Sequence, residues 1–152
     1  MKQTADDLEA MIGYRLKQAQ SALRARTDEA LRPLGLTTPQ YSCLEAIERN
    51  PGASNSEIAR GVFVTRQTMS TLFRGLQQRG LVDRAESAEA GRAIPTALTD
   101  EGRRLLVEAS ERVGRINQAI TDALGPELTA ALALGLSRCI ETLESGPSYF
   151  TD

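Results

Sequence analysis

Apolar residues recur every three or four positions along most of the chain, which is the spacing of one face of an α-helix. The first such stretch has its apolar positions at Leu8, Met11, Ile12, Leu16, Ala19, Leu23, Ala30 and Leu31. Pro33 and Gly35 end it. A second helix begins near Thr38, a capping hydroxyl followed by proline in the first turn, and stops at Asn50-Pro51-Gly52. The pattern therefore predicts a long helix and then a shorter one.

Two short helices are predicted next. Ser54 and Glu57 are spaced as a capping box, in which each side chain satisfies a free backbone N–H group of the other residue. Thr65 is the expected N-cap of the second short helix, and Gly80 ends it as a left-handed residue would. The inward face of that helix is predicted to consist of Met69, Leu72, Phe73 and Leu76. Its polar residues then lie on the opposite face.

The second half of the chain predicts a hairpin and two more helices. The segment 81–98 contains Gly91 and Pro95 between short β-compatible pieces, so we expect two antiparallel strands. Thr99 then caps a helix that Gly125-Pro126 interrupts, and a last helix follows. Residues 147–152 are predicted to form a flexible tail. The predicted fold class is mainly α, with six helices and one small β-hairpin.

The composition excludes several classes of function and leaves the predicted fold unchanged. The chain of 152 residues has no histidine, which removes Ser-His and Cys-His nucleophile pairs and the commonest zinc ligand. No carboxylate pair has a recognisable acid/base or metal-binding spacing. The longest apolar stretch, 130–136, is too short to span a membrane, and the acidic N-terminal segment is unlike a signal peptide. We expect a cytoplasmic protein that is not an enzyme and uses no metal or cofactor.

Positive charge is concentrated in one segment of a chain whose net charge is −2. No acidic residue occurs between Ile58 and Val82. Residues 60–84 contain five arginines and one aspartate, a net charge of +4, so the rest of the chain carries −6. Phosphate contacts need cations only at the contact face, so a protein that is acidic overall can still bind nucleic acid. The alternative is a solvated face that lacks acids by chance.

Two short helices in succession, the second with arginine, glutamine and hydroxyl side chains facing outward, predict a helix-turn-helix. We expect its recognition helix over 65–79 and a wing over 82–98, which together make a winged helix-turn-helix. Side chains of these types read base edges and hold phosphates in a major groove. The predicted DNA contacts are Arg60, Thr65, Arg66, Gln67, Ser70, Thr71 and Arg74, with Arg92 in the wing.

With these features in place, the sequence resembles the MarR (multiple-antibiotic-resistance regulator) family of bacterial transcription regulators. The matching segments are Leu36 to Tyr41, Ser56 to Arg60, Val64 to Ser70, Leu76 to Val82 and Leu98 to Arg103. The resemblance implies a homodimer in which helices at 1–32 and 100–146 interlock, while lobes at 33–99 meet successive major grooves of a pseudo-palindromic operator. It also implies a repressor that a small-molecule effector releases from DNA.

The sequence departs from the family pattern at two places. The family's wing commonly carries Asp-x-Arg, but Ala90-Gly91-Arg92 keeps the arginine and lacks the aspartate. We expect Arg92 to reach the minor groove, oriented by Glu86 or Glu89; a solvated charge at the wing tip is the alternative. Phe63 stands where a helix-turn-helix often has glycine. These departures leave open a winged-helix module that binds protein and has lost DNA binding.

The sequence indicates residues for effector binding or redox sensing less clearly than residues for DNA contact. Tyr14, Arg15 and Tyr41 are candidates for the effector cleft that the family implies, with helix packing or plain surface exposure as the alternative. A thiol-based redox sensor is another hypothesis, because Cys43 and Cys139 are present. Both cysteines lie on apolar helical faces, where a free cysteine is usually a small buried hydrophobe. Redox sensing is therefore the less favoured hypothesis.

Overall fold

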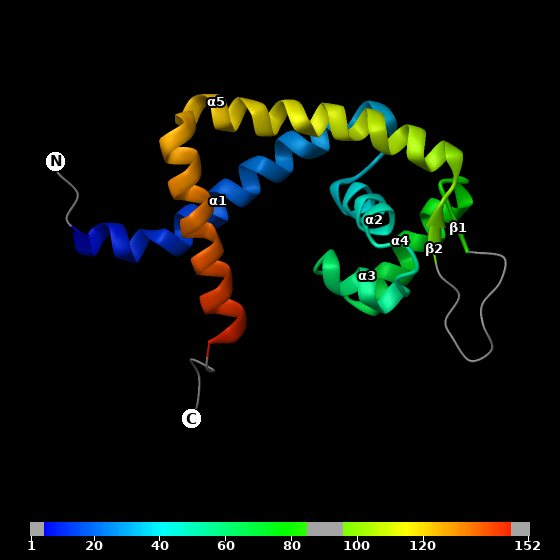
Figure 1. Cartoon of the computed structure of the whole chain (residues 1–152), viewed down its shortest axis with the longest axis horizontal. Helices are drawn as coiled ribbons and strands as arrows, with labels where there is room; N and C mark the ends of the chain where they lie inside the picture. Colours follow the sequence, from blue (N-terminus) through cyan, green and yellow to red (C-terminus); the bar gives the residue numbers. More distant parts are fainter. Residues whose placement is uncertain (1–4, 85–95, 147–152) are drawn as a thin grey trace. The chain divides into compact units, whose positions relative to one another are not determined.

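The computed structural model describes residues 5–84 and 96–146 (Figure 1). Its elements are α1 (Ala5–Leu31), a 3-10 turn η1 (Arg32–Leu34), α2 (Thr38–Arg49), α3 (Asn55–Gly61), α4 (Arg66–Gln78), β1 (Val82–Arg84), β2 (Thr96–Leu98) and α5 (Asp100–Ser145). The chain divides into two compact units, Met1–Val113 and Gly114–Asp152. The element order confirms a mainly helical winged-helix fold with a two-stranded hairpin.

The start of α2 differs by one residue from the prediction. Its N-cap is Thr37, not Thr38: the Thr37 hydroxyl accepts from the backbone N–H of Gln40 at 3.3 Å, and Gln40 Oε1 accepts from the N–H of Thr37 at 3.0 Å. Only Thr37 has a glutamine or glutamate three positions later, which is the reciprocal partner of a capping box. Thr38 instead ties α2 to α1, because its hydroxyl donates to Asp28 Oδ1 at 2.6 Å.

The caps of the two short helices are confirmed. The Ser54 hydroxyl accepts from the backbone N–H of Glu57 at 3.3 Å, and the Glu57 carboxylate accepts from the N–H of Ser54 at 2.7 Å. The Thr65 hydroxyl accepts from the backbone N–H of Thr68 at 3.1 Å. Each cap satisfies N–H groups that a helix start leaves without a carbonyl partner. Both helices of the motif therefore begin where their sequence signals placed them.

The turn between α3 and α4 has the geometry that glycine usually provides. Phe63 has φ = 58°, in the left-handed region, and is the one non-glycine residue with positive φ in the described part of the chain. The N–H of Val64 donates to the carbonyl of Ala59 at 3.0 Å, which closes the end of α3. Phenylalanine at this position therefore keeps the helix-turn-helix turn, at the expense of an unfavourable backbone conformation.

The hairpin is antiparallel, with Val82 opposite Leu98 and Arg84 opposite Thr96. This pairing confirms the two strands predicted within 81–98. The connection between them, and with it Arg92, lies outside the described residues, as does the predicted tail at 147–152. The described strands nevertheless place a two-stranded ribbon directly after the recognition helix in the chain.

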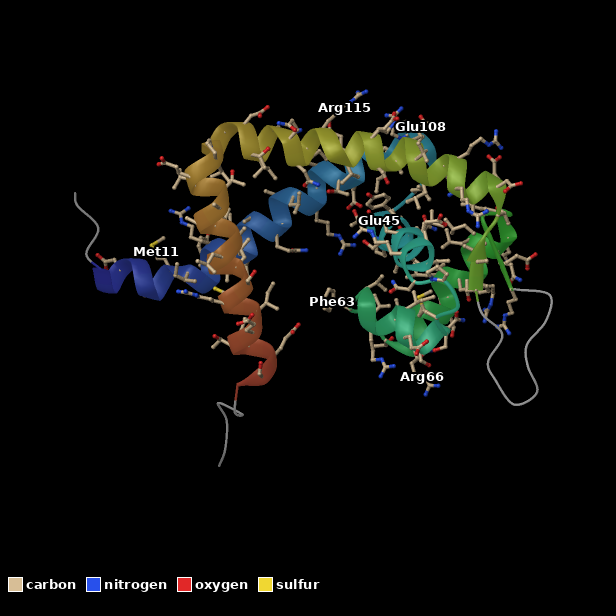
Figure 2. The ribbon with its side chains drawn as sticks, in the orientation of Figure 1. Met11, Glu45, Phe63, Arg66, Glu108 and Arg115 are labelled. Carbon is tan, nitrogen blue, oxygen red and sulfur yellow. The ribbon has the colours of Figure 1, made fainter. Side chains whose placement is uncertain are left out.

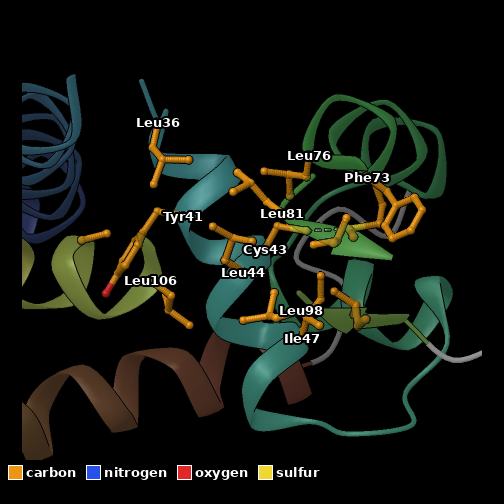
Figure 3. Close-up of a cluster of buried hydrophobic side chains, with 14 of the residues drawn as sticks. Leu36, Tyr41, Cys43, Leu44, Ile47, Phe73, Leu76, Leu81, Leu98 and Leu106 are labelled. Carbon is orange, nitrogen blue, oxygen red and sulfur yellow. Dashed lines mark hydrogen bonds between the residues drawn. The ribbon is translucent and has the colours of Figure 1, made fainter. Parts of the chain in front are cut away.

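The core of the first unit is built around α2, which contacts α1, α3, α4 and β2 (Figure 3). The inward face of α2 consists of Tyr41, Cys43, Leu44 and Ile47, all of them buried. Around it pack the buried side chains Leu31, Leu36, Ile58, Ala59, Met69, Phe73, Leu76, Leu81, Val82, Leu98, Leu106 and Ala109. Full burial of a leucine or isoleucine contributes about 1.5–3 kcal/mol, so this cluster fixes α3 and α4 relative to α2.

The second unit consists of the continuation of α5. Its backbone is non-helical at Gly125 (φ 74°, ψ 168°), and Pro126 follows. The break predicted at Gly125-Pro126 is confirmed as a kink between two helical stretches. Because these stretches are continuous within α5, the described residues count five α-helices where six were predicted. Glycine permits the positive φ, and the missing N–H of proline falls in the first turn after the kink, so no loop is needed.

Many apolar side chains of the second unit are exposed. They are Ile120, Leu128, Leu132, Leu134, Leu136, Ile140 and Leu143, with exposed fractions from 38% at Leu136 to 69% at Leu143. By length and composition alone, one window of α5 would also suit a membrane span, a weak test that helices of soluble proteins pass as well. Exposed apolar residues at this density are typical of an interaction surface.

Candidate nucleic-acid interface

The recognition helix α4 has one buried face and one polar face. Met69 and Leu76 are fully buried and Phe73 nearly so, which anchors the helix on the core. The opposite face carries Arg66, Gln67, Ser70, Thr71 and Arg74, and all five are exposed. Arg66 lies in the first turn of α4, on the side away from α2 (Figure 2). The helix thus presents to solvent the side chains that the sequence assigned to DNA contact.

Two hydroxyl groups on this face already use their protons in hydrogen bonds within the helix. Ser70 Oγ donates to the carbonyl of Arg66 at 3.0 Å, and Thr71 Oγ1 donates to the carbonyl of Gln67 at 3.2 Å. Their protons are therefore engaged within the helix, while their oxygen lone pairs remain available. In this state both hydroxyls can accept hydrogen bonds from the exocyclic amino groups of adenine or cytosine in a major groove.

Thr65 is exposed, but its hydroxyl is already used. It accepts from the backbone N–H of Thr68 and donates to the Thr68 hydroxyl at 2.9 Å. Its clearest role is to fix the N-terminus of α4. The positive end of the helix dipole and the free N–H groups of this first turn favour an anion such as phosphate there. A contribution of Thr65 to DNA contact stays a prediction.

The arginines of the predicted patch are not equivalent. Arg66 and Arg74 have no ion-pair partner among the described residues, so their charges are available to phosphate. Arg60 is exposed at the end of α3 and lies near Glu57. The pKa of the Glu57 carboxyl lies below its usual value, mainly because the carboxylate accepts from the Ser54 N–H, and Arg60 adds to this effect. Three cations therefore remain at the polar face of the helix pair.

Arg79 is directed elsewhere. Its guanidinium donates to the carbonyl of Gly35 at 2.6 Å and to that of Leu34 at 3.1 Å. It contributes to the net charge of the segment 60–84, but these bonds hold it at the corner between η1 and α2. The local excess of positive charge is thus larger than the charge that faces outward from α4.

Arg84 is a cation of the same segment that the sequence did not assign to the interface. Its guanidinium lies over the ring of Phe73, 5.7 Å from the ring centre, while its side chain stays exposed at the end of β1. A cation above an aromatic ring is attracted by the ring's electrons, with a typical energy of about 0.5–1 kcal/mol at exposed sites. Because the two residues belong to different elements, no local pattern indicated this contact.

The three candidate effector residues have different environments. Tyr41 is buried, and its hydroxyl donates to Ser110 Oγ at 3.4 Å. Burial is the main reason why the pKa of Tyr41 is raised. Tyr14 is 62% exposed on α1, and Arg15 donates to Gln18 Oε1 at 3.0 Å. Four surface cavities in the described part of the first unit are lined by other residues, so the assignment of these three stays a prediction.

The two cysteines are both free. Cys43 is completely buried against α4, with its sulfur 3.8 Å from Met69 Sδ. Burial raises the pKa of the Cys43 thiol to about 12, so the reactive thiolate is scarce at neutral pH. Cys139 is half-buried in the second unit. Cys43 therefore has the properties of a core residue, contrary to what a redox sensor requires. Within the described residues, no group of three or more metal-ligating side chains occurs either.

A helix pair with an outward polar face, followed by a two-stranded ribbon, defines a winged helix-turn-helix protein, a class that binds double-stranded DNA. The MarR family profile matches residues 34–93 of the chain. The HTH-type transcriptional repressor Rv2887 of Mycobacterium tuberculosis is 38% identical over 141 residues, which cover 93% of this chain and 97% of the relative. The chain belongs to the MarR family. It is a DNA-binding transcriptional repressor of that family and not an enzyme.

Solved structures agree with this assignment. CouR bound to a 23-mer DNA duplex is similar with a TM-score of 0.80 at 30% identity, over 92% of this chain and 99% of that one. Rv2887 in complex with salicylic acid is similar with a TM-score of 0.69 at 34% identity, over 84% and 95% of the two chains. These relatives bind DNA and small molecules on the same fold.

Proposed function

We propose that this repressor acts in the cytoplasm as a homodimer on a pseudo-palindromic operator and that a small-molecule effector releases it. In this proposal each subunit inserts α4 into a major groove. Arg60, Arg66 and Arg74 contact phosphates or guanine, and Gln67, Ser70 and Thr71 read base edges, with Thr65 fixing the first turn. Arg92 contacts the minor groove from the wing. The regions 1–32 and 100–146 form the dimer, and 33–99 forms the DNA-binding lobe.

The exposed, acid-free outward face of α4 carries this proposal. Its five polar side chains point to solvent, whereas the buried face holds the helix on the core. An α-helix of this size fits a major groove, and arginine and glutamine are the side chains that pair with guanine and adenine edges. Packing within the protein does not account for these five side chains, because none of them is buried.

Exposed apolar side chains support the homodimer. In the second unit they include Leu128, Leu132 and Ile140, and on α1 they include Ile12 and Leu23. Apolar surface of this extent is stabilised when a second copy covers it, since about 25 cal/mol is gained per Å² removed from water. A two-fold dimer would also present two recognition helices to the two halves of a palindrome.

The small-molecule effector is supported by the relatives. Rv2887 is known in complex with salicylic acid, and CouR in complex with p-coumaroyl-CoA. Both ligands contain an aromatic ring, so we propose an aromatic carboxylate or its thioester as the effector class. Tyr14, Arg15 and Tyr41 remain the candidate contacts, and a titration that releases the protein from operator DNA identifies the ligand.

The test begins with selection of bound duplexes from a random pool, which returns the half-site and its spacing. Affinity for that operator is then measured over a range of salt concentrations. Arg74→Ala is expected to weaken binding and to reduce the salt slope by about 0.9 for each phosphate that the arginine neutralises. Gln67→Ala is expected to lower discrimination between operator and mismatched duplex by about 1–3 kcal/mol. Arg49→Ala, on the exposed side of α2, is the matched control and should change neither quantity.

Two results would contradict this assignment. If Arg74→Ala and Gln67→Ala both bind operator like the parent protein, α4 does not read DNA. If the parent protein binds every duplex weakly and without dependence on salt, the chain is a winged-helix module for protein interactions.

A further inference from the structure

Arg79 differs from the other arginines of the segment 60–84 in what it binds. It is the C-cap residue of α4, and its guanidinium donates to the carbonyls of Leu34 and Gly35, at 3.1 and 2.6 Å. These carbonyls lie 45 and 44 positions earlier in the chain. The contact therefore joins the end of the recognition helix to the corner between α1 and α2.

The corner is built to receive such a donor. Gly35 has φ = 66° and closes η1, with its N–H donating to the carbonyl of Arg32 at 3.0 Å. A helix end leaves carbonyls without intrahelical partners, and the Leu34 and Gly35 carbonyls are two of them. A guanidinium presents several N–H groups in one plane, so one side chain satisfies both. A lysine ammonium lacks this planar fork.

The corner is itself anchored. Leu31 on one side of it is completely buried, and Leu36 on the other is 4% exposed. At the opposite end of α4, Thr65 caps the first turn and Met69 is fully buried. The buried side chains Met69, Phe73 and Leu76 hold α4 on the core, and Arg79 adds a polar tie between the C-terminal end of the helix and this corner.

We infer that Arg79 is a positioning residue for DNA binding: it sets the orientation of the recognition helix through the Leu34 and Gly35 carbonyls and does not contact phosphate. The inference rests on the proposed function, because it assumes that α4 reads DNA. A helix that reads base edges must keep its angle in the groove, because base readout depends on hydrogen-bond geometry and supplies the sequence information that phosphate contacts lack. Loss of Arg79 therefore lowers operator affinity more than affinity for a random duplex.

The experiment uses the full chain with Arg79→Ala, Arg79→Lys and Arg74→Ala. Affinity for operator and for a random duplex is measured by fluorescence anisotropy at several salt concentrations, below the thermal transition of each variant. Arg79→Ala should bind operator roughly tenfold more weakly, with the salt slope unchanged. Arg79→Lys keeps the charge but not the fork, so it should be as weak as the alanine variant. Arg74→Ala should reduce the slope.

A phosphate contact gives the opposite results. The inference is overturned if Arg79→Ala reduces the salt slope by about 0.9 per neutralised phosphate, or if Arg79→Lys restores operator binding. It is also overturned if operator and random duplex lose affinity equally. If Arg79→Ala does not fold, the lysine variant alone decides. Failure of the proposed function is seen separately, because Arg74→Ala would then leave both affinity and slope unchanged.

Discussion

Gly102, in the first turn of α5, lies against the backbone of the segment that leads into the hairpin. A Cβ added there would come within contact distance of three backbone atoms of Leu81, with its carbonyl oxygen at only 2.0 Å and its carbonyl carbon at 3.0 Å. The same oxygen accepts from the Thr99 N–H at 3.0 Å, and the Thr99 hydroxyl accepts from the Gly102 N–H at 3.0 Å. Gly102→Ala therefore forces α5 and the hairpin apart at their junction.

The expected magnitude follows from three contributions. Alanine in place of glycine stabilises an open helix by about 1 kcal/mol. Against this, overpacking costs about 1–3 kcal/mol. Weakening the bond from Thr99 to Leu81 costs a further ~0.5–1.5 kcal/mol. A separation of 2.0 Å from a backbone oxygen cannot be relieved by rotating a side chain, so the upper part of each range applies. We expect Gly102→Ala to destabilise the protein by about 2–3.5 kcal/mol.

Urea unfolding at a fixed protomer concentration measures this change. The matched control is Gly75→Ala in α4, where an added Cβ meets no atom within 4 Å. That variant should gain up to about 1 kcal/mol, so the same substitution has opposite signs at the two positions. A Gly102→Ala protein as stable as the parent would show that the junction relaxes freely and that the packing argument is wrong.

Three further outcomes are expected. Phe63→Asn should raise the free energy of unfolding by about 0.5–1 kcal/mol in urea titrations, because asparagine tolerates the left-handed conformation and Phe63 is already 86% exposed; a loss of stability would contradict this. The bond from Thr38 lowers the pKa of Asp28, so its stabilisation is present above the ordinary aspartate pKa and is lost as pH falls through the lower folded value. Asp28→Asn should therefore lower Tm at neutral pH and reduce the fall of Tm in acid, and an unchanged acid profile would refute it. Iodoacetamide at about pH 8 should leave Cys43 unmodified in the native protein and label it in urea, by mass spectrometry of peptides; rapid native labelling of Cys43 would exclude its burial.

Local signals predicted the helix starts well. Ser54 with Glu57, and Thr65 with Thr68, are pairs three positions apart, and the structure forms both. The one misplaced cap, Thr38 in place of Thr37, arose because the proline signal was followed instead of the reciprocal partner Gln40. Caps are predictable because both partners lie within one helical turn of the chain, so their contact does not depend on the tertiary structure.

Contacts between distant segments were not predictable from these patterns. Thr38 bonds to Asp28 across the corner between two helices, and Arg84 lies over Phe73 from a neighbouring strand. Neither pair has a periodic or motif-like spacing. The kink at Gly125 was recognised as a break, but a sequence break does not distinguish a loop from a bend within one element.

The arginines of the segment 60–84 show how charge counted from the sequence and side-chain direction seen in the structure combine. Counting residues assigns five arginines to the segment 60–84, and all five would favour phosphate if they faced outward. The structure turns Arg79 toward the Leu34 and Gly35 carbonyls and places Arg84 over the ring of Phe73, so three of the five arginines, Arg60, Arg66 and Arg74, face outward from the helix pair. The salt slope of operator binding therefore reflects fewer contacts from this segment than its composition implies. Arg79 keeps its charge but is held on these carbonyls, so in our inference it acts on the angle of α4 and contributes to specificity, whereas the charge count would have assigned it to phosphate affinity.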